Sequence, residues 1–419
     1  MATTVPSATD TSNKCCAIEI ARDSGEVLDL RNDWLQLILS SADSGSASPI
    51  VLDPSIDMEF HLTMLQHGSG ILRPHVTVLR QGGIAKSILV GRIESAPLRV
   101  KVGYKSLSSP PVRVLTLTHG GMLGEDSQEN AAALVDSVQK CLSNREADVA
   151  FFYGMETDST FYRAVRNAGS WSTRDYNPAV MRRWRIPLPA SYEQLYRQRS
   201  SNTRHNLKRY SKRLRETFKD QLAVRTYQHA SEVEALLSDT EVIAAKTYQR
   251  GLGVGFAETE LTRQLMMLAA RRGWLRAYIL YAGSRPIAFW NGFLYHRTLF
   301  TGSTGYDPDL GDLRPGTFLL ERMLEELCAE KTADNVDFGF GDAQYKRDWC
   351  DHEHFQVSQY LFAPTLGGLC LNVAYNSLCG ASRTIRAIAD RTGVVPKLKR
   401  AWRHRRAESL VKKPCQDVK

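Results

Sequence analysis

The stretch 274–349 decides the fold, and its sequence is WLRAYILYAGSRPIAFWNGFLYHRTLFTGSTGYDPDLGDLRPGTFLLERMLEELCAEKTADNVDFGFGDAQYKRDW. Aromatic and β-branched residues fill 274–281 and 286–294, and the turn residues between these runs predict a β-hairpin. A third strand is expected at 298–306. The segment 307–316 contains two prolines and two glycines, which predicts a loop.

A helix and a short strand are expected after this loop. The apolar residues between 317 and 330 recur at the spacing of one buried helix face, and the charged residues lie outside that face. The apolar positions are Leu319, Leu320, Met323, Leu324, Leu327 and Cys328, and the outer positions are Glu321, Arg322, Glu325, Glu326 and Glu330. The run 336–340 then reads as a fourth strand. The order is thus three antiparallel strands, a helix and a strand.

The start of this helix is a candidate anion site. The first backbone amides of a helix lack partners within the helix, and the helix dipole favours negative charge there. Arg314, Gly316 and Thr317 are therefore candidate contacts of a phosphate or pyrophosphate. The alternative is an ordinary helix start, with Thr317 as its N-cap.

Five segments carry a family resemblance. They are 285–289 (RPIAF), 305–308 (GYDP), 314–317 (RPGT), 338–346 (FGFGDAQYK) and 200–215 (SSNTRHNLKRYSKRLR). Together they resemble the CelD-type GNAT acetyltransferases, tandem-GNAT proteins associated with cellulose and exopolysaccharide synthesis. That group is similar to the Fem-type peptidoglycan aminoacyltransferases. The resemblance implies an acyltransferase whose acyl donor is acetyl-CoA or another acyl-CoA.

The N-terminal half repeats the same order of elements. A strand at 113–118, a glycine loop at 119–124, a helix at 127–143 and a strand at 148–153 are expected. The predicted fold class is α/β (α+β), with two tandem GNAT-like modules and a basic C-terminal tail. Each module is a mixed, mostly antiparallel sheet flanked by helices. The expected units are a disordered N-terminus at 1–13, an N-terminal module at 14–188, a C-terminal acetyltransferase module at 189–365 and a basic extension at 366–419.

The composition is typical of a soluble, cytoplasmic protein. The chain has 419 residues, 43% of them hydrophobic and 24% charged, and its sequence has no apolar run of the length that spans a membrane. The eight cysteines lack the spacing of zinc ligands or of a disulfide framework, which favours reduced thiols. The His-Glu-His run at 352–354 lacks a third ligand at helical spacing, so no metal is assigned.

The net charge of +9 is concentrated in the C-terminal tail. Residues 383–419 hold twelve Lys and Arg against three acidic residues, and the rest of the chain is neutral. The body therefore has no field that would attract DNA. Two interpretations of the tail stay open, which are peripheral contact with an anionic membrane and a merely solubilising segment.

A basic helix is expected at 200–218. One apolar stripe alternates with Lys and Arg, and Arg204 and Lys208 are candidate substrate contacts. Such a surface suits a nucleotide, the phosphates of a sugar carrier, or tRNA. The alternative is a solvated amphipathic helix that packs by its stripe. Aromatic residues do not interleave with the charges, which weakens the tRNA interpretation.

The segment after the fourth strand holds the candidate catalytic groups. Acyl transfer to an amine needs a base for the ammonium proton and an acid for the leaving thiolate. Asp342 is the candidate base, with capping of the next helix as the alternative. Tyr345 is the candidate acid. Gln344 and Lys346 are candidate substrate contacts, and a salt bridge is the alternative for Lys346.

The first functional hypothesis is an acyl-CoA-dependent N-acyltransferase. Its acceptor would be an amino sugar, or a polysaccharide or cell-envelope precursor, whose amine attacks the thioester directly. One alternative is a Fem-like transferase that uses aminoacyl-tRNA. Another is a non-catalytic GNAT scaffold of a polysaccharide synthesis complex. It is favoured because the glycines of 311–316 stand at a different spacing from those of the general GNAT pyrophosphate signature. His119, which precedes two glycines, is either a cleft residue or an ordinary turn histidine.

Overall fold

The computed structural model describes residues 16–42, 52–102, 105–247, 250, 255–350 and 352–391. Within these residues thirteen strands form one continuous sheet, in the order β1-β3-β4-β5-β6-β13-β7-β12-β11-β10-β9-β8, with β2 paired to β4. The strands are β1 (Cys16–Ala21), β2 (Ile71–Pro74), β3 (Val76–Gln81), β4 (Ile84–Val102), β5 (Lys105–Gly124), β6 (Val149–Glu156), β7 (Ala179–Pro187), β8 (Leu222–Tyr227), β9 (Leu275–Ala282), β10 (Arg285–Tyr295), β11 (Thr298–Tyr306), β12 (Asn335–Phe340) and β13 (His352–Phe362).

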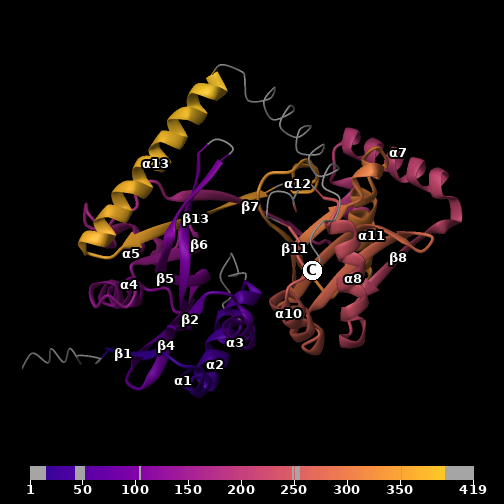
Figure 1. Ribbon diagram of the computed structural model, residues 1–419. Helices are drawn as coiled ribbons and strands as arrows, with labels where there is room; N and C mark the ends of the chain where they lie inside the picture. Colours follow the sequence, from indigo (N-terminus) through magenta and orange to yellow (C-terminus); the bar gives the residue numbers. More distant parts are fainter. Residues whose placement is uncertain are drawn as a thin grey trace, which may run out of the picture.

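Helices cover this sheet in both halves of the chain (Figure 1). The α-helices are α1 (Ser24–Asp29), α2 (Arg31–Ala42), α3 (Met58–His67), α4 (Gln128–Ser143), α5 (Thr160–Ala168), α6 (Tyr192–Arg197), α7 (Ser201–Phe218), α8 (Val233–Ala244), α10 (Glu260–Arg271), α11 (Pro315–Glu330), α12 (Gln344–Trp349) and α13 (Leu366–Arg391). The 3₁₀ helices are η1 (Pro54–Ile56), η2 (Lys219–Gln221), η3 (Ala230–Glu232) and η4 (Pro308–Leu313).

The two halves have the same core architecture, which confirms the predicted duplication. In the N-terminal half β4 pairs antiparallel with β5, α4 follows, and β6 then pairs parallel with β5. In the C-terminal half β10 pairs antiparallel with β11, α11 follows, and β12 pairs parallel with β11. A right-handed crossover through a helix is the usual way to join two parallel neighbours, so each half is built on one such unit.

The halves exchange strands where they meet. β7, which ends the N-terminal half, pairs antiparallel with β12 of the C-terminal half. β13 runs back toward the N-terminal half and lies between β6 and β7, antiparallel to both. In Figure 1 these two strands bridge the purple and the orange parts of the molecule. The sheet therefore continues through the seam, which we define as the region around β6, β13, β7 and β12.

The predicted buried face of α11 is confirmed. Its apolar side chains pack on β9 and β10 in one core with Trp290 and Val336. One residue departs from the pattern, because Glu321 was expected outside the face and is buried. Its carboxylate accepts hydrogen bonds from the hydroxyl groups of Tyr192 at 3.1 Å and Ser211 at 2.9 Å. A buried carboxylate that is hydrogen-bonded can replace an apolar residue on such a face.

Two segments that were expected to be loops have regular structure. In 307–316, Pro308–Leu313 forms η4, and α11 already begins at Pro315. The expected glycine loop at 119–124 forms the end of β5. A bulge interrupts this strand between Leu117 and Met122, both of which pair with β4. Positive φ angles of +76° at Gly120 and +72° at Gly121 allow this bulge, since only glycine adopts them without strain.

The C-terminal extension begins with one long helix, α13, which packs on β4 and β13. The apolar run 366–378 contains glycine and asparagine and is nevertheless helical, and Asn372 and Asn376 bond to the neighbouring segment 172–176. Within the described residues, none of the helices is both long and apolar enough to cross a membrane. The predicted disordered N-terminus at 1–13 and the tail at 392–419 lie outside the described residues.

Candidate functional site

The strands β11 and β12 separate after a short parallel contact. Among the described residues they pair only where Thr298–Phe300 meets Asn335–Asp337. β11 then continues along β10, whereas Phe340 at the end of β12 pairs with Arg183 of β7. The facing edges of the two strands therefore diverge. α11 begins just beyond the end of β11, so its N-terminus lies at the open end of this divergence.

The N-terminus of α11 has the features of an anion site. Its N-cap is Arg314, which adopts a left-handed conformation with φ +55°, and no side chain of the described residues caps the helix there. Thr317 is therefore not the N-cap, contrary to the alternative considered from the sequence. Pro315 has no amide hydrogen, and the amide of Gly316 stands in the first turn. The amide of Thr317 donates to the carbonyl oxygen of Arg314 at 3.1 Å. The amide of Gly316 and the helix dipole therefore favour a negatively charged group at this end.

The equivalent helix of the N-terminal half, α4, has a side-chain cap at its N-terminus. The hydroxyl of Ser127 caps α4 by accepting from the amide of Asn130 at 3.2 Å. Next to it, the carboxylate of Asp126 accepts from the amides of Thr160 and Phe161 at 2.9 and 2.8 Å. A side-chain cap and a nearby carboxylate both disfavour an added anion. The C-terminal half is thus the better place for a phosphate.

Basic side chains from α7 lie beside the start of α11. Arg213 donates through Nη1 to the carbonyl oxygen of Asp312 at 3.5 Å, in the turn that leads to the helix. The guanidinium groups of Arg209 and Arg314 both stack on the ring of Tyr210, at 5.1 and 5.8 Å from its centroid. These residues add positive charge to the same end of α11.

Arg204 and Lys208, the two residues of α7 predicted to contact substrate, do not lie beside the start of α11. Arg204 donates through Nη1 to the carbonyl oxygens of Arg197 and Arg199 at 2.8 and 2.9 Å. Lys208 lies over the ring of Tyr196 at 6.0 Å. Both side chains therefore face α6, whereas Arg213 reaches Asp312 of η4 and Arg209 stacks on Tyr210. Only the packing of α7 distinguishes these two basic stripes.

Trp290 connects the start of α11 to the candidate acid Tyr345. Its indole Nε1 donates to the carbonyl oxygen of Gly316 at 3.4 Å. The ring of Tyr345 packs edge-on against Trp290 at a centroid distance of 5.4 Å, and against Phe338 at 5.8 Å. The structure thus brings together Gly316 and Tyr345, which are far apart in the sequence. Trp290 is buried, and no motif in the sequence marked it for this link.

Asp342 and Gln344 lie on the exposed side of the same segment. The carboxylate of Asp342 accepts from Arg347 at 3.1 Å, and both side chains are half-exposed. α12 has Ala343 as its N-cap, so the alternative that Asp342 caps this helix is wrong. Gln344 donates through Nε2 to Asp348 at 2.8 Å.

Lys346 has a structural position that differs from the predicted substrate contact. It is buried, and its ammonium group donates to the carbonyl oxygens of Phe338, Gly339 and Phe340 at 2.7, 3.3 and 2.7 Å. These three bonds use all the ammonium hydrogens and hold the end of β12 in place. Burial lowers the pKa of Lys346 to about 8, although the nearby Asp337 opposes this shift.

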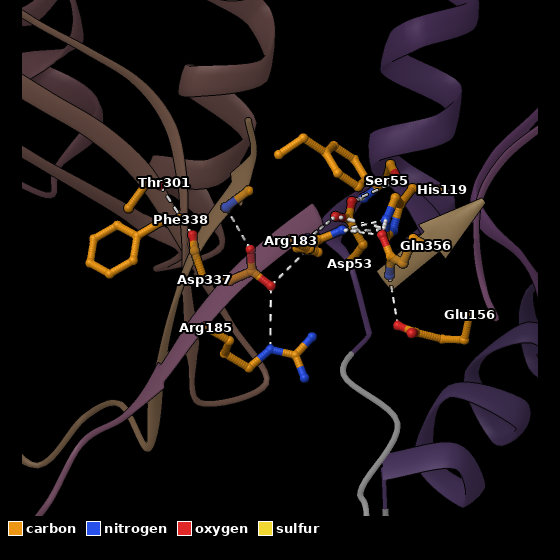
Figure 2. Close-up of polar contacts among 12 residues, drawn as sticks. Asp53, Ser55, His119, Glu156, Arg183, Arg185, Thr301, Asp337, Phe338 and Gln356 are labelled. Atoms are coloured by element: carbon orange, nitrogen blue, oxygen red, sulfur yellow. Dashed lines mark hydrogen bonds and ion pairs between the residues drawn. The ribbon is translucent and has the colours of Figure 1, made fainter. Parts of the chain in front are cut away.

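A buried cluster of charged side chains occupies the seam (Figure 2). Arg183 of β7 donates through Nε to Asp337 of β12 at 2.8 Å and through Nη2 to Asp53 at 3.2 Å. Arg185 also reaches Asp337, at 3.3 Å. Burial alone would raise the pKa of Asp53, but the guanidinium of Arg183 and the hydrogen bonds from Ser55 oppose this effect, and the pKa of this carboxyl is lowered. The cluster joins both halves, and no local sequence motif marked Arg183 or Asp53.

His119 belongs to this cluster rather than to a turn. Its Nε2 lies 2.8 Å from Oε1 of Gln356, its Nδ1 lies 3.5 Å from Asp53, and Arg183 contacts the ring. Gln356 in turn donates to Glu156 at 2.7 Å. Burial is the largest influence on the pKa of His119 and lowers it, and the adjacent guanidinium of Arg183 acts in the same direction. The imidazole is thus held neutral in the interior.

One further group of side chains combines residue types that can bind a metal. Within the described part of the chain, only His75, Cys141 and Glu146 bring three potential ligand atoms within 4.8 Å of one another. Arg73 pairs with Glu146 at 2.5 Å, and its other terminal nitrogen lies 3.3 Å from Nδ1 of His75. Arg22 pairs with Glu146 as well. Two guanidinium groups on one carboxylate compete with any cation, so this group does not suggest a metal site.

Comparisons with known proteins agree with the fold described above. Residues 201–347 match the family model of the acetyltransferase (GNAT) domain. No curated protein matches the chain. The structure is similar to that of FemX, with 9% identity, a TM-score of 0.51, and coverage of 79% of this chain and 96% of FemX.

Two other solved structures are similar over comparable lengths. A tandem GNAT protein from the clavulanic acid biosynthesis pathway has 12% identity and a TM-score of 0.47, with 83% of this chain and 99% of that protein covered. The C-terminal domain of a putative lysylphosphatidylglycerol synthetase from Agrobacterium fabrum has 10% identity and a TM-score of 0.45, with 81% and 95% covered. Residues 201–347 thus match the acetyltransferase (GNAT) domain, and the fold as a whole is similar to that of FemX.

Proposed function

We propose that this protein is an acyl-CoA-dependent N-acyltransferase whose donor, acetyl-CoA or another acyl-CoA, binds at the start of α11. The observation that carries the proposal is the side-chain-uncapped N-terminus of α11 at the point where β11 and β12 diverge. A pyrophosphate has the charge and the oxygen acceptors that this end of a helix attracts. The family match over 201–347 supports the assignment to this half.

The donor would contact residues that the structure brings to one place. The amide of Gly316 would face the pyrophosphate, and Arg314 with Arg213 would supply positive charge. Thr317 would stand beside it, with its own amide donating to the carbonyl oxygen of Arg314 at 3.1 Å. A Cβ at Gly316 would lie 3.5 Å from the ring of Tyr306, which is ordinary contact, so a bulkier side chain such as leucine is needed to obstruct the approach to the backbone. The thioester would then extend into the space between β11 and β12, where the edge of β11 has no strand partner among the described residues beyond Phe300.

The reaction would be a direct transfer without an acyl-enzyme. The acceptor amine forms a bond to the thioester carbonyl carbon, and the carbon–sulfur bond breaks as the tetrahedral intermediate collapses. The ammonium proton passes to Asp342, and the phenol of Tyr345 protonates the departing thiolate. Tyr345 is suited to this role by its contact with Trp290, which also holds Gly316.

The proposed acceptor is the amine of an amino sugar, or of a polysaccharide or cell-envelope precursor. The support for this class is the resemblance to the CelD-type proteins. A second candidate, a Fem-like transferase that uses aminoacyl-tRNA, is favoured by the exposed basic residues of α7, including Lys212 and Arg215. The third, a non-catalytic scaffold, would retain the fold without binding a donor.

Donor binding separates these candidates. Acetyl-CoA and longer acyl-CoAs would be titrated calorimetrically into the wild type, Gly316→Leu and Gly380→Leu. Both glycines are helical and partly buried, and a side chain at Gly380 meets nothing within 4 Å, so this variant is the matched control. We expect saturable binding that Gly316→Leu weakens by about tenfold or more and Gly380→Leu retains. Binding of tRNA without acyl-CoA would instead support the Fem-like candidate, and binding of neither would support the scaffold.

A further inference from the structure

We propose that the outer face of α13, together with the Trp171 turn beside it, docks on the surface of an anionic lipid bilayer. This inference is independent of the proposed catalytic function. α13 lies along the outside of the N-terminal half (Figure 1). Its inner side packs against the sheet, where Leu371 and Tyr375 meet the core around Phe362. The helix is therefore fixed to the body by one side only.

The outer side of α13 is exposed and uncharged, and its side chains are apolar apart from Ser377 and Thr384. Leu366, Val373 and Ile385 are 84%, 57% and 48% exposed, and Cys370, Ala374 and Ala381 are exposed between them. These positions recur at helical spacing and so lie on one face. In the sequence, 366–382 contains no charged residue. A surface helix of a soluble protein normally turns its charged residues outward, so this face lacks the usual solvated side chains.

Two exposed aromatic residues lie next to this face. Trp171 is 75% exposed and Tyr176 is 54% exposed. Their turn is fixed to the helix, because Asn372 donates to the carbonyl oxygens of Ser172 and Arg174 at 2.8 and 3.1 Å. The amide of Tyr176 also donates to Asn376 at 2.8 Å. Tryptophan and tyrosine are the residues that collect at the level of lipid headgroups.

The charge of the following sequence identifies the occupant. The excess positive charge of the chain, +9, begins at Arg383 on α13 and continues to residue 419. Arg383 donates to the carbonyl oxygen of Pro178, which keeps this cation beside the aromatic turn. An apolar helix face, interfacial aromatics and adjacent basic residues are together the composition of a helix that lies in the plane of a membrane surface. A protein groove would take the apolar residues but would not require the concentrated positive charge.

Vesicle co-sedimentation of the full chain tests this surface. The vesicles would be phosphatidylcholine alone, or phosphatidylcholine mixed with phosphatidylglycerol. The variant is Val373→Asp, and its matched control is Leu72→Asp, since Val373 and Leu72 are both 57% exposed. We expect binding to the anionic vesicles that Val373→Asp weakens by about tenfold and Leu72→Asp leaves unchanged. Equal binding of the two variants, or equal binding to both vesicle types, would overturn the proposal.

Two further measurements define the mode of binding. Tryptophan emission should shift to shorter wavelength when anionic vesicles are added, and the shift should be reduced in Trp171→Phe while co-sedimentation persists. Replacing Arg403, Arg405 and Arg406 by glutamine should weaken the preference for anionic lipid. If light scattering shows a dimer that Val373→Asp dissociates, and vesicles do not bind, the face is a contact between two copies and the proposal fails.

Discussion

Arg183 and Asp337 meet at 2.8 Å across the neighbouring strands β7 and β12, although one comes from each half of the chain. The carboxylate of Asp337 is fully buried, and it also accepts from Arg185 and from the amide of Gly339 at 2.7 Å. Arg183 also pairs with Asp53 through Nη2. Removing one member of such a group leaves an uncompensated charge in the interior, which costs more free energy than the intact pair contributes.

Asp337→Asn should therefore destabilise the protein strongly. The amide keeps the shape of the side chain but removes the buried anion that Arg183 and Arg185 share, and Asp53 still pairs with Arg183 alone. We therefore expect a loss of about 3–5 kcal/mol in the free energy of unfolding. Urea denaturation measures this loss. The control is Asp334→Asn, whose partner Arg297 is half-exposed, and it should cost about 1 kcal/mol or less. Similar losses in the two variants would show that the seam pair is not essential.

Tyr345→Phe tests the proposed proton donor. The ring and its packing on Trp290 are retained, but the thiolate loses its acid, so kcat should fall by about 10²-fold or more with KM for the donor unchanged. Steady-state acyl transfer with separate donor titrations gives both constants. Tyr162→Phe, in the core of the N-terminal half, serves as the control. A change confined to KM would assign Tyr345 to donor binding instead.

Asp342→Asn tests the proposed base, and Arg347→Met separates that role from the ion pair. The amide cannot accept the ammonium proton, so kcat/KM should fall by about 10²-fold and its dependence on pH should change. Arg347→Met removes the 3.1 Å partner but keeps the carboxylate, and its activity should remain near that of the wild type. Equal losses in both variants would indicate that the ion pair matters and not the base.

Lys346 should make stability depend on pH above neutrality. Burial lowers its pKa from 10.5 to about 8, so between these values the folded state has released a proton that the unfolded state still holds. The free energy of unfolding of the wild type, relative to Lys346→Met, should therefore rise as pH increases from 8 to 10.5. Urea titrations at several pH values measure this difference. A constant difference would show that the ammonium is not disfavoured in the folded protein.

His61 should make the protein sensitive to acid. Its imidazole is buried against Trp34, its two nitrogens find no hydrogen-bond partner among the described residues, and burial lowers its pKa from 6.5 to about 3. The stability that depends on neutral His61 is complete above pH 6.5 and is lost as pH falls toward 3. Between pH 6.5 and 5, the free energy of unfolding of the wild type should fall by about 1–2 kcal/mol more than that of His61→Leu. Parallel stability curves of the two proteins would contradict this expectation.

Local patterns in the sequence predicted much of the fold. The apolar spacing of Leu319, Met323 and Leu327 was sufficient to place α11, because a helix that packs on a sheet must turn one stripe inward. The same logic failed at Glu321, whose burial depends on hydroxyl groups from α6 and α7. Hydrogen bonds between distant elements leave no periodic signal in the sequence.

The candidate site was predictable only in part. Gly316 and Tyr345 were predicted from short motifs, and the structure brings both into contact with Trp290. The choice between Arg204 and Arg213 depended on the rotation of α7 about its axis, which is set by tertiary packing. The position of Arg183 depended on the pairing of β7 with β12, and the sequence of a single strand does not specify its partner.

The position of β13 has a consequence for biosynthesis. β6 and β7 hydrogen-bond to a strand that ends at Phe362, so their edges toward β13 stay open until residues 352–362 have left the ribosome. At usual elongation rates of 5–20 residues per second, β6 waits about 10–40 s for its neighbour. Unpaired edges of this kind attract other chains during synthesis. The N-terminal half should thus need chaperone protection while it is nascent, and should aggregate when it is expressed without β13.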